Sequence, residues 1–129
     1  MAGTKHPLSN RELDIMNTFW DSDKPLIASE IVQINSELSI NTVQATLKKL
    51  LNKSYIKISD IVYSGTVLTR SYEALVTRDT YMVNQIRANQ VSTLGLVSQL
   101  IQEEEDPEVL EKLAKLIREK QDALRSPND

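Results

Sequence analysis

The sequence predicts a mainly α-helical protein with one small β-hairpin and a helical C-terminal region. Apolar residues follow a helical period from Ser9 to Asn52, alternate with period two from Tyr55 to Glu73, and return to a helical period after Thr77. A chain of 129 residues accommodates one compact domain with an appendage. We expect the compact domain in residues 1–76 and the appended helical region in residues 77–129.

The composition excludes several classes of function. The chain has no cysteine, which excludes disulfides, thiolate zinc sites and cysteine nucleophiles. No apolar run reaches membrane-spanning length, and residues 1–7 lack the apolar core of a signal peptide. We therefore expect a soluble, cytoplasmic protein with no membrane partner, no metal site and no cofactor.

The first helix begins at a capping box. Ser9 is the expected N-cap, Glu12 lies three residues later, and Leu8 precedes the cap where it can pack against Leu13. The stripe continues to Trp20, which we interpret as a core residue because large aromatic side chains on an apolar stripe usually pack inside. The helix is expected to end in residues 21–25, which are polar and close with a proline.

Two further helices and a short strand follow. Residues 26–27 can add a short strand to a small sheet, and residues 28–35 predict a short second helix. A turn of a few residues then leads to a third helix, capped by Ser39 or Asn41. Its apolar residues recur at helical spacing and should lie on the core: Val43, Leu47, Leu50 and Leu51.

The opposite face of this third helix carries amides, small residues and lysines: Asn41, Thr42, Gln44, Ala45, Lys48, Lys49 and Asn52. Residues 38–57 contain four lysines and no acid. Lysine, Asn and Gln reach phosphates and base edges, while Ala and Thr permit close approach to a duplex. We interpret this surface as a DNA-recognition helix, the alternative being an ordinary solvated face.

The net charge of −3 does not exclude a nucleic-acid partner, because the charge is segregated. Residues 1–80 carry nine Lys or Arg and nine Asp or Glu, whereas residues 81–129 carry six and nine. Affinity for DNA depends on the phosphates that are neutralised locally. The excess acid lies away from the predicted contact surface.

A hairpin is expected directly after the recognition helix. Residues 55–62 and 66–73 are rich in Ile, Val, Thr and Tyr, and Ser64-Gly65 between them is a turn signal. Two closely joined helices followed by a hairpin predict a winged helix-turn-helix domain. Lys57 and Arg70 are candidate phosphate contacts at the wing, although they can equally be ordinary strand-face charges.

The full set of predicted DNA contacts combines the recognition helix with the wing: Ser39, Asn41, Thr42, Gln44, Ala45, Lys48, Lys49, Lys53, Lys57, Ser64 and Arg70. The recognition helix is expected to span about residues 39–53 and the wing about residues 55–73. The partner of this surface would be double-stranded DNA.

Helical pattern resumes after Thr77, in two segments that are expected to meet near Ser92-Thr93. Asp106-Pro107-Glu108 predicts the start of the last helix, and residues 126–129 should fray. So much apolar surface beyond a self-sufficient domain needs a partner, and a second copy of the same region predicts a symmetric homodimer. The expected dimerisation residues are Leu94, Val97, Ile101, Val109, Leu110, Leu113, Leu116 and Ile117.

These elements resemble the penicillinase-repressor family, which includes regulators of beta-lactamase and methicillin resistance and the copper-transport repressor. The resemblance runs from Leu8 to about Lys120 and depends on the order and spacing of several short patterns. They are Leu8-Ser9-x-x-Glu12-Leu13-x-Ile15-Met16-x-x-Phe19-Trp20, Pro25-Leu26-x-Ala28-x-Glu30-Ile31, Thr42-Val43-x-x-x-Leu47-x-x-Leu50-x-x-Lys53, Tyr72 and Leu75-Val76-Thr77.

The resemblance implies a dimeric bacterial repressor that reads inverted-repeat operators with a TACA/TGTA-type core. It places DNA contacts at Ser39, Thr42, Gln44, Ala45, Lys48 and Lys49. It also implies release of repression by a sensor protease or by copper. The chain has no Asn-Phe cleavage pair near residues 97–99 and no cysteine for copper.

Three substitutions depart from the family pattern and bear on local geometry. Ile27 replaces a helix-capping Thr, Ser54 replaces the Gly after the recognition helix, and Ala74 replaces a Pro after the wing tyrosine. All three lie at element ends, so they concern caps and turns more than the fold.

An enzyme is not expected. His6 is the only histidine, residues 103–106 form an acidic run without a calcium-loop pattern, and the glycines are isolated rather than gathered in a phosphate loop. Two other functions stay open. One is a winged helix used for protein contacts, and the other is a regulator with an effector pocket between the helical tail and the winged domain.

Overall fold

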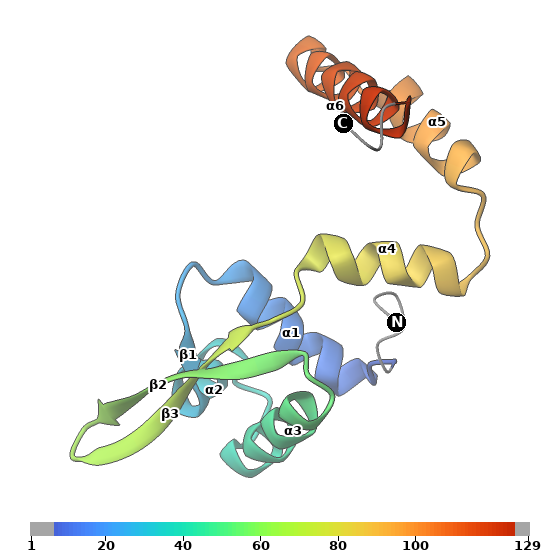
Figure 1. Cartoon of the computed structure of the whole chain (residues 1–129). Helices are drawn as coiled ribbons and strands as arrows, with labels where there is room; N and C mark the ends of the chain where they lie inside the picture. The colour runs from blue at the N-terminus through green and yellow to red at the C-terminus, as the bar shows by residue number, and fades with distance from the viewer. Residues whose placement is uncertain (1–6, 126–129) are drawn as a thin grey trace. The chain divides into compact units, whose positions relative to one another are not determined.

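The computed structural model describes residues 7–125, which form six helices and a three-stranded sheet (Figure 1). Contacts divide the chain into two compact units, one up to Asn89 and one from Gln90 onward. The break therefore comes after the fourth helix, whereas the sequence analysis expected it after Val76. The elements are α1 Asn10–Asp21, β1 Leu26–Ile27, α2 Ala28–Ile34, α3 Ile40–Asn52, β2 Ile56–Ser64, β3 Val67–Ala74, α4 Arg78–Ala88, α5 Thr93–Glu103 and α6 Pro107–Arg125.

The capping box that was predicted for α1 is present. The Ser9 hydroxyl accepts a hydrogen bond from the Glu12 amide at 3.1 Å, and the Ser9 amide donates to the Glu12 carboxylate at 2.8 Å. Two of the amides that a helix start leaves without intrahelical partners are thereby satisfied.

The start of α2 is capped by a residue inside the helix. Ile27 occupies the N-cap position, where it has no polar side-chain atom, and its amide donates to the Glu30 carboxylate at 2.9 Å. The Lys24 ammonium reaches the same carboxylate at 2.7 Å. Glu30 thus supplies the half of the capping box that satisfies the Ile27 amide, whereas the acceptor that a threonine hydroxyl would offer to the first turn of α2 is absent.

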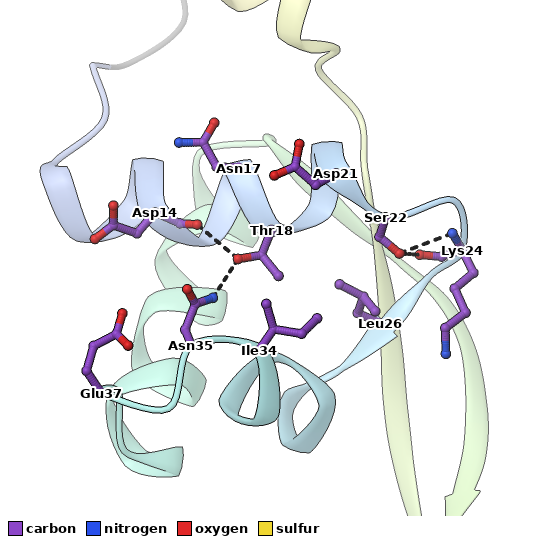
Figure 2. A pocket seen from close by; sticks show the side chains of 10 residues that line it. All are labelled: Asp14, Asn17, Thr18, Asp21, Ser22, Lys24, Leu26, Ile34, Asn35 and Glu37. Carbon is purple, nitrogen blue, oxygen red and sulfur yellow. Dashed lines mark hydrogen bonds between the residues drawn. The ribbon is translucent and has the colours of Figure 1, made fainter.

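The turn between α2 and α3 is attached to α1. The Asn35 side-chain amide donates to the Thr18 hydroxyl at 2.6 Å, and that hydroxyl donates to the Asp14 carbonyl at 3.1 Å (Figure 2). Leu38, in the same turn, is buried. Polar and apolar anchors together therefore hold α2 and α3 in a helix-turn-helix arrangement.

The sheet has the order β1-β3-β2, and both pairings are antiparallel. The short strand predicted at residues 26–27 is confirmed, since Leu26 pairs with Tyr72 on β3. β2 and β3 form the predicted hairpin, and Gly65 lies in its turn with a φ of 65° that suits glycine. The hairpin projects from the body of this unit (Figure 1), which makes it the wing of a winged helix-turn-helix fold.

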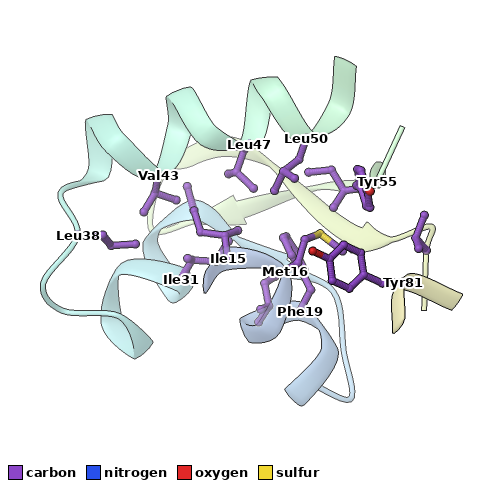
Figure 3. Close-up of a cluster of buried hydrophobic side chains, with 14 residues drawn as sticks. Ile15, Met16, Phe19, Ile31, Leu38, Val43, Leu47, Leu50, Tyr55 and Tyr81 are labelled. Carbon is purple, nitrogen blue, oxygen red and sulfur yellow. The ribbon is translucent and has the colours of Figure 1, made fainter. Parts of the chain in front are cut away.

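The core of the first unit lies between α1, α2, α3 and the base of the sheet (Figure 3). The predicted buried stripe of α3 is confirmed for Val43, Leu47 and Leu50, while Leu51 is half-buried and packs at the edge of the core. The full set of buried apolar residues is Ile15, Met16, Phe19, Leu26, Ala28, Ile31, Leu38, Val43, Leu47, Leu50, Tyr55, Ile56, Val76 and Tyr81.

Trp20 joins α1 to the start of α4. The indole is half-buried, and its N–H donates to the Val76 carbonyl at 2.8 Å. Its ring lies 5.5 Å from the ring of Tyr81, and the Arg78 guanidinium lies over it at 5.5 Å while pairing with Asp21 at 2.7 Å. These contacts make α4 part of the first unit.

A buried ion pair connects α1 with the end of α3. The Lys53 ammonium lies 2.7 Å from the Glu12 carboxylate, whose side chain is only 4% exposed. Burial raises the pKa of Glu12, but hydrogen bonds from Lys53 and from the Ser9 amide outweigh it, so the pKa lies below its ordinary value. The charged carboxylate is therefore favoured in the folded protein.

The second unit consists of α5 and α6, and neither helix has a buried residue. The Asp106 carboxylate accepts a hydrogen bond from the Glu108 amide at 2.9 Å, as predicted for the start of α6. Across residues 7–125, no helix combines the length and apolarity that crossing a membrane requires.

Substitution of Trp20 by Phe should destabilise the first unit. The variant keeps an aromatic ring but leaves the buried Val76 carbonyl without its donor, so we expect the free energy of unfolding to fall by about 1–3 kcal/mol. Urea unfolding followed by far-UV circular dichroism at one fixed protein concentration measures the change.

The matched control is Tyr81→Phe, which removes only a hydroxyl and keeps the aromatic ring that packs 5.5 Å from the indole. We expect this control to stay within about 0.5 kcal/mol of the original chain. Equal effects of the two substitutions would contradict the role assigned to the indole N–H.

The Glu12–Lys53 pair should make stability dependent on pH. Because the pKa of Glu12 is lowered by folding, its contribution is complete above the unfolded-state pKa and is lost as the pH falls through the folded-state pKa. Urea unfolding between about pH 7 and pH 3 should show this loss, and Glu12→Gln should flatten the curve.

In the Glu12→Gln variant, part of the dependence of stability on pH should remain. The reason is that the pKa of Glu30 is also lowered, by Lys24 first and then by the Ile27 amide. An identical pH profile in the original chain and in the Glu12→Gln variant would rule out a contribution from the pair.

Candidate nucleic-acid interface

The outward face of α3 is the polar face that the sequence predicted. Asn41, Gln44, Ala45, Lys48 and Lys49 are all exposed, on the side of the helix opposite the buried stripe. The helix is therefore two-sided, with one side in the core and the other available to a ligand. Thr42 is half-buried at the edge of this face.

The hydroxyls at the start of α3 are used to cap the helix. The Ser39 side chain accepts from the Thr42 amide at 3.1 Å and donates to the Thr42 hydroxyl at 3.0 Å. Ser39 is thus the N-cap, and Asn41 lies inside the helix. The positive end of the helix dipole lies at this exposed cap and favours an anion there.

Lys48 and Lys49 carry charges that nothing in residues 7–125 compensates. The ion pairs in that part of the chain involve other cations, namely Lys24, Lys53, Arg78 and Arg125. Two neighbouring ammonium groups on an exposed, acid-free face attract a polyanion without first having to break an internal ion pair.

Lys53 differs from the other predicted contacts. It is half-buried, and its ammonium donates to the Glu12 carboxylate at 2.7 Å and to the Pro7 carbonyl at 3.0 Å. The charge is therefore directed toward α1 and neutralised there. The structure groups Lys53 with the supports of α3 and not with its exposed face.

The end of α3 is closed by a left-handed turn at Ser54, which has a φ of 63°. The Ser54 amide donates to the Leu51 carbonyl and the Tyr55 amide to the Leu50 carbonyl, both at 3.0 Å, which is the Schellman pattern. The serine adopts the conformation that the family's glycine favours. Burial, followed by the nearby Tyr81 and Glu12, raises the pKa of the Tyr55 phenol.

The predicted wing contacts Lys57, Ser64 and Arg70 are exposed. Lys57 lies opposite Glu73 in the register of β2 and β3, and Arg70 lies opposite Ile61. Residue 74 continues β3 as a paired strand residue, so the substitution of Ala for Pro leaves the wing base intact.

The wing carries an apolar surface that was not predicted from the sequence. Four side chains near its tip are more than half exposed: Ile61, Tyr63, Val67 and Leu68. Direct pairing of Tyr63 with Leu68 places these two on one face of the hairpin. Apolar residues that alternate with polar ones usually indicate a half-buried strand, but no described element of the first unit covers this part of the hairpin (Figure 1).

An open depression lies between α1 and α2 (Figure 2). Several of its polar groups already have partners within the protein, since Asn35 bonds Thr18 and Asp21 pairs with Arg78. It does not correspond to the effector pocket that was considered between the helical tail and the winged domain. Its lining residues are Asp14, Asn17, Thr18, Asp21, Ser22, Lys24, Leu26, Ile34, Asn35 and Glu37.

The other candidate sites have structural explanations. In the acidic run, the Glu104 carboxylate accepts from the Asp106 amide at 3.0 Å, so these residues form the turn into α6. Within residues 7–125, no cluster of three His, Cys, Asp or Glu residues is arranged to hold a metal ion. His6 and residues 126–129 lie outside the described residues.

Two solved structures resemble the chain distantly. The chain is 16% identical to Streptococcus pneumoniae FabT in a crystal structure with DNA, with 89% of this chain and 77% of that chain covered and a TM-score of 0.42. It is 17% identical to a chain of the Giardia lamblia Hop2-Mnd1 complex, with coverage of 91% and 78% and a TM-score of 0.41. No curated protein matches the chain.

The family comparison is decisive. The model of the penicillinase repressor family matches residues 8–119, which include all of the winged domain and most of the helices that follow. This match confirms the resemblance that the sequence patterns indicated, and it agrees with the helix-turn-helix and the wing described above. The chain belongs to the penicillinase repressor family and is a winged-helix, DNA-binding transcriptional repressor, not an enzyme.

Proposed function

We propose that the protein is a homodimeric bacterial repressor that binds an inverted-repeat operator in double-stranded DNA, with α3 in the major groove. The observation that carries this proposal is the uncompensated pair Lys48 and Lys49 on the exposed, acid-free face of α3. The core fixes which side of the helix faces outward, so both ammonium groups are presented together.

The exposed residues of α3 fall into two groups, those that contact phosphates and those that contact base edges. Lys48 and Lys49 contact phosphates, and the exposed N-terminal end of the helix receives a further phosphate. Asn41 and Gln44 reach base edges, since their amides match the donor and acceptor pattern of adenine. Ala45 leaves space for close approach. Thr42, half-buried beside the cap, lies at the edge of the contact.

The wing makes a smaller contribution to phosphate binding in this proposal. Arg70 and the turn at Ser64 lie against the backbone, whereas the charge of Lys57 is offset by Glu73 across the strand pair. A wing of this kind orients the domain on the duplex more than it strengthens binding.

A second copy of the chain supplies the partner for α5 and α6. Large apolar side chains on these helices are exposed, for example Leu94 at 79% and Leu116 at 60%. Neither helix is stable alone in water without burying such a face, and a symmetric dimer buries the same face twice. The proposed interface comprises Leu94, Val97, Ile101, Val109, Leu110, Leu113, Leu116 and Ile117.

Relief of repression by a sensor protease requires a cleavage site other than Asn-Phe. The corresponding segment, residues 97–99, reads Val-Ser-Gln and lies within α5. An operator-bound repressor acts where the DNA is, so we place the protein in the cytoplasm.

The second candidate function is a winged helix that binds another protein. The exposed Ile61, Tyr63, Val67 and Leu68 on the wing favour it, because grouped apolar side chains often mark protein contacts. Salt dependence separates the two functions: DNA binding weakens steeply with salt and depends on duplex sequence, whereas an apolar protein contact does neither.

Reversal of both α3 charges, Lys48→Glu with Lys49→Glu, should abolish operator binding. The change replaces attraction of phosphates by repulsion in each half-site, so we expect affinity to fall by more than about a hundredfold. Fluorescence anisotropy with inverted-repeat duplexes at fixed salt measures it, and circular dichroism checks the fold.

The matched control is Lys115→Glu with Arg118→Glu, which makes the same charge change on the polar side of α6. Its operator affinity should stay within about threefold of the original chain. Unchanged affinity in the α3 variant, or an equal loss in the control, would exclude α3 as the contact surface.

Substitution of Leu113 by Asp should produce monomers. The side chain lies on the apolar stripe of α6, and a carboxylate buried at a dimer interface is strongly unfavourable. Loss of the dimer removes simultaneous engagement of two half-sites, which lowers operator affinity by about 10²–10⁴-fold. Sedimentation velocity reports the mass, and Lys115→Asp on the opposite side of α6 is the control. A stable dimer of the Leu113→Asp variant would exclude α6 from the interface.

A further inference from the structure

We propose that Glu12 and Lys53 are positioning residues, which hold the C-terminal end of the recognition helix at a fixed place so that its outer face meets the base edges. Lys53 then acts through Glu12 and makes no phosphate contact. The proposal rests on the proposed function, because it concerns how the same α3 surface reads DNA.

The pair joins two helix ends through a single carboxylate oxygen. Glu12 Oε1 accepts from the Ser9 amide at 2.8 Å, which closes the cap of α1, and from Lys53 Nζ at 2.7 Å. Lys53 is the C-cap residue of α3, and its ammonium also donates to the Pro7 carbonyl at 3.0 Å. The start of α1 and the end of α3 are thereby fastened at one point.

The location of the Glu12–Lys53 contact favours a role in positioning α3. The apolar stripe of α3 fixes which side is buried, and the Glu12–Lys53 contact adds a polar restraint at the C-terminal end of the helix. A charge-assisted hydrogen bond has a defined length and direction. Ion pairs removed from water often add little net stability compared with apolar residues, and in some proteins they contribute conformational specificity instead.

The charge of Lys53 is neutralised where it lies. Its side chain is 28% exposed, against 4% for Glu12, and the carboxylate is 2.7 Å away. Two of the three N–H donors of this ammonium are already used by Glu12 and the Pro7 carbonyl, and the Glu12 carboxylate offsets the charge that would attract a phosphate. Lys48, by contrast, is exposed and has no ion-pair partner within residues 7–125.

The Glu12→Gln variant separates a positioning role from a purely electrostatic role, because the two roles predict opposite changes in operator affinity. Gln is accepted at this place in a capping box, so the cap of α1 survives. Removal of a negative charge near a DNA-binding helix should strengthen binding to every duplex if only charge matters. If the pair positions α3, operator affinity should fall about tenfold relative to affinity for a scrambled duplex, as for removal of one base-specific hydrogen bond.

The salt dependence of binding tests the role of Lys53 directly. Lys53→Met should leave the slope of log affinity against log salt unchanged while lowering the ratio of operator to scrambled-duplex affinity. Lys48→Met is the matched control, and its slope should become shallower by about 0.9 for each phosphate that the variant no longer neutralises. Circular dichroism at the assay temperature establishes that each variant is folded before its affinity is compared.

Amide hydrogen exchange tests the positioning without DNA. In Glu12→Gln, exchange should accelerate about tenfold or more at the amides of Leu51, Asn52 and Lys53 and stay unchanged at the start of α3, as expected for local opening of one helix end.

Three results would overturn the proposal: an unchanged operator-to-scrambled ratio in folded Glu12→Gln, a shallower salt slope in Lys53→Met, or unchanged exchange at the end of α3. Failure of the proposed function looks different. In that case the original chain itself would show no preference for any inverted-repeat duplex, and the exchange experiment alone would decide whether the pair fixes α3.

Discussion

Burial of one side of α3 determines what the other side can do. Val43, Leu47 and Leu50 are inserted in the core, so a rotation of the helix by one residue would bring Lys48 or Lys49 toward apolar surroundings. Burial of an unpaired ammonium is far more costly than the removal of any single interaction on the outer face. The orientation of the recognition surface is therefore a consequence of core packing, and the polar residues need only be compatible with it.

α1 supports this arrangement by holding three other elements from one helix. Glu12 reaches the end of α3, Thr18 receives the turn between α2 and α3, and Trp20 reaches the chain just before α4. Each attachment is a directional hydrogen bond beside an apolar contact. Apolar packing fixes the distance of each attached segment from α1, and the hydrogen bonds fix the position along α1 at which each segment is held.

Sequence patterns predicted the features that depend on nearby residues. The cap at Ser9, the cap at Ser39 and the turn at Gly65 each involve partners within a few positions, so their chemistry is visible in a short window. The role of Lys53 was not visible, because its partner lies 41 residues away. The attachment of α4 through Trp20 was not visible for the same reason, and contacts divide the chain after Asn89, later than the boundary expected after Val76.

Under the proposed function, the distribution of charge predicts that a single copy of the winged domain binds DNA weakly. Lys53 is neutralised by Glu12, which leaves Lys48, Lys49, Lys57 and Arg70 as the exposed cations of the proposed surface within residues 7–125, with Lys57 opposite Glu73 in the strand register. Few neutralised phosphates mean low affinity for any single half-site. Joining two such surfaces converts the second contact into an intramolecular one and multiplies affinity without adding charge. In the proposed dimer, pairing of the exposed apolar faces of α5 and α6 would compensate for the sparse charge of α3, because selectivity would come from requiring two weak, correctly spaced contacts together.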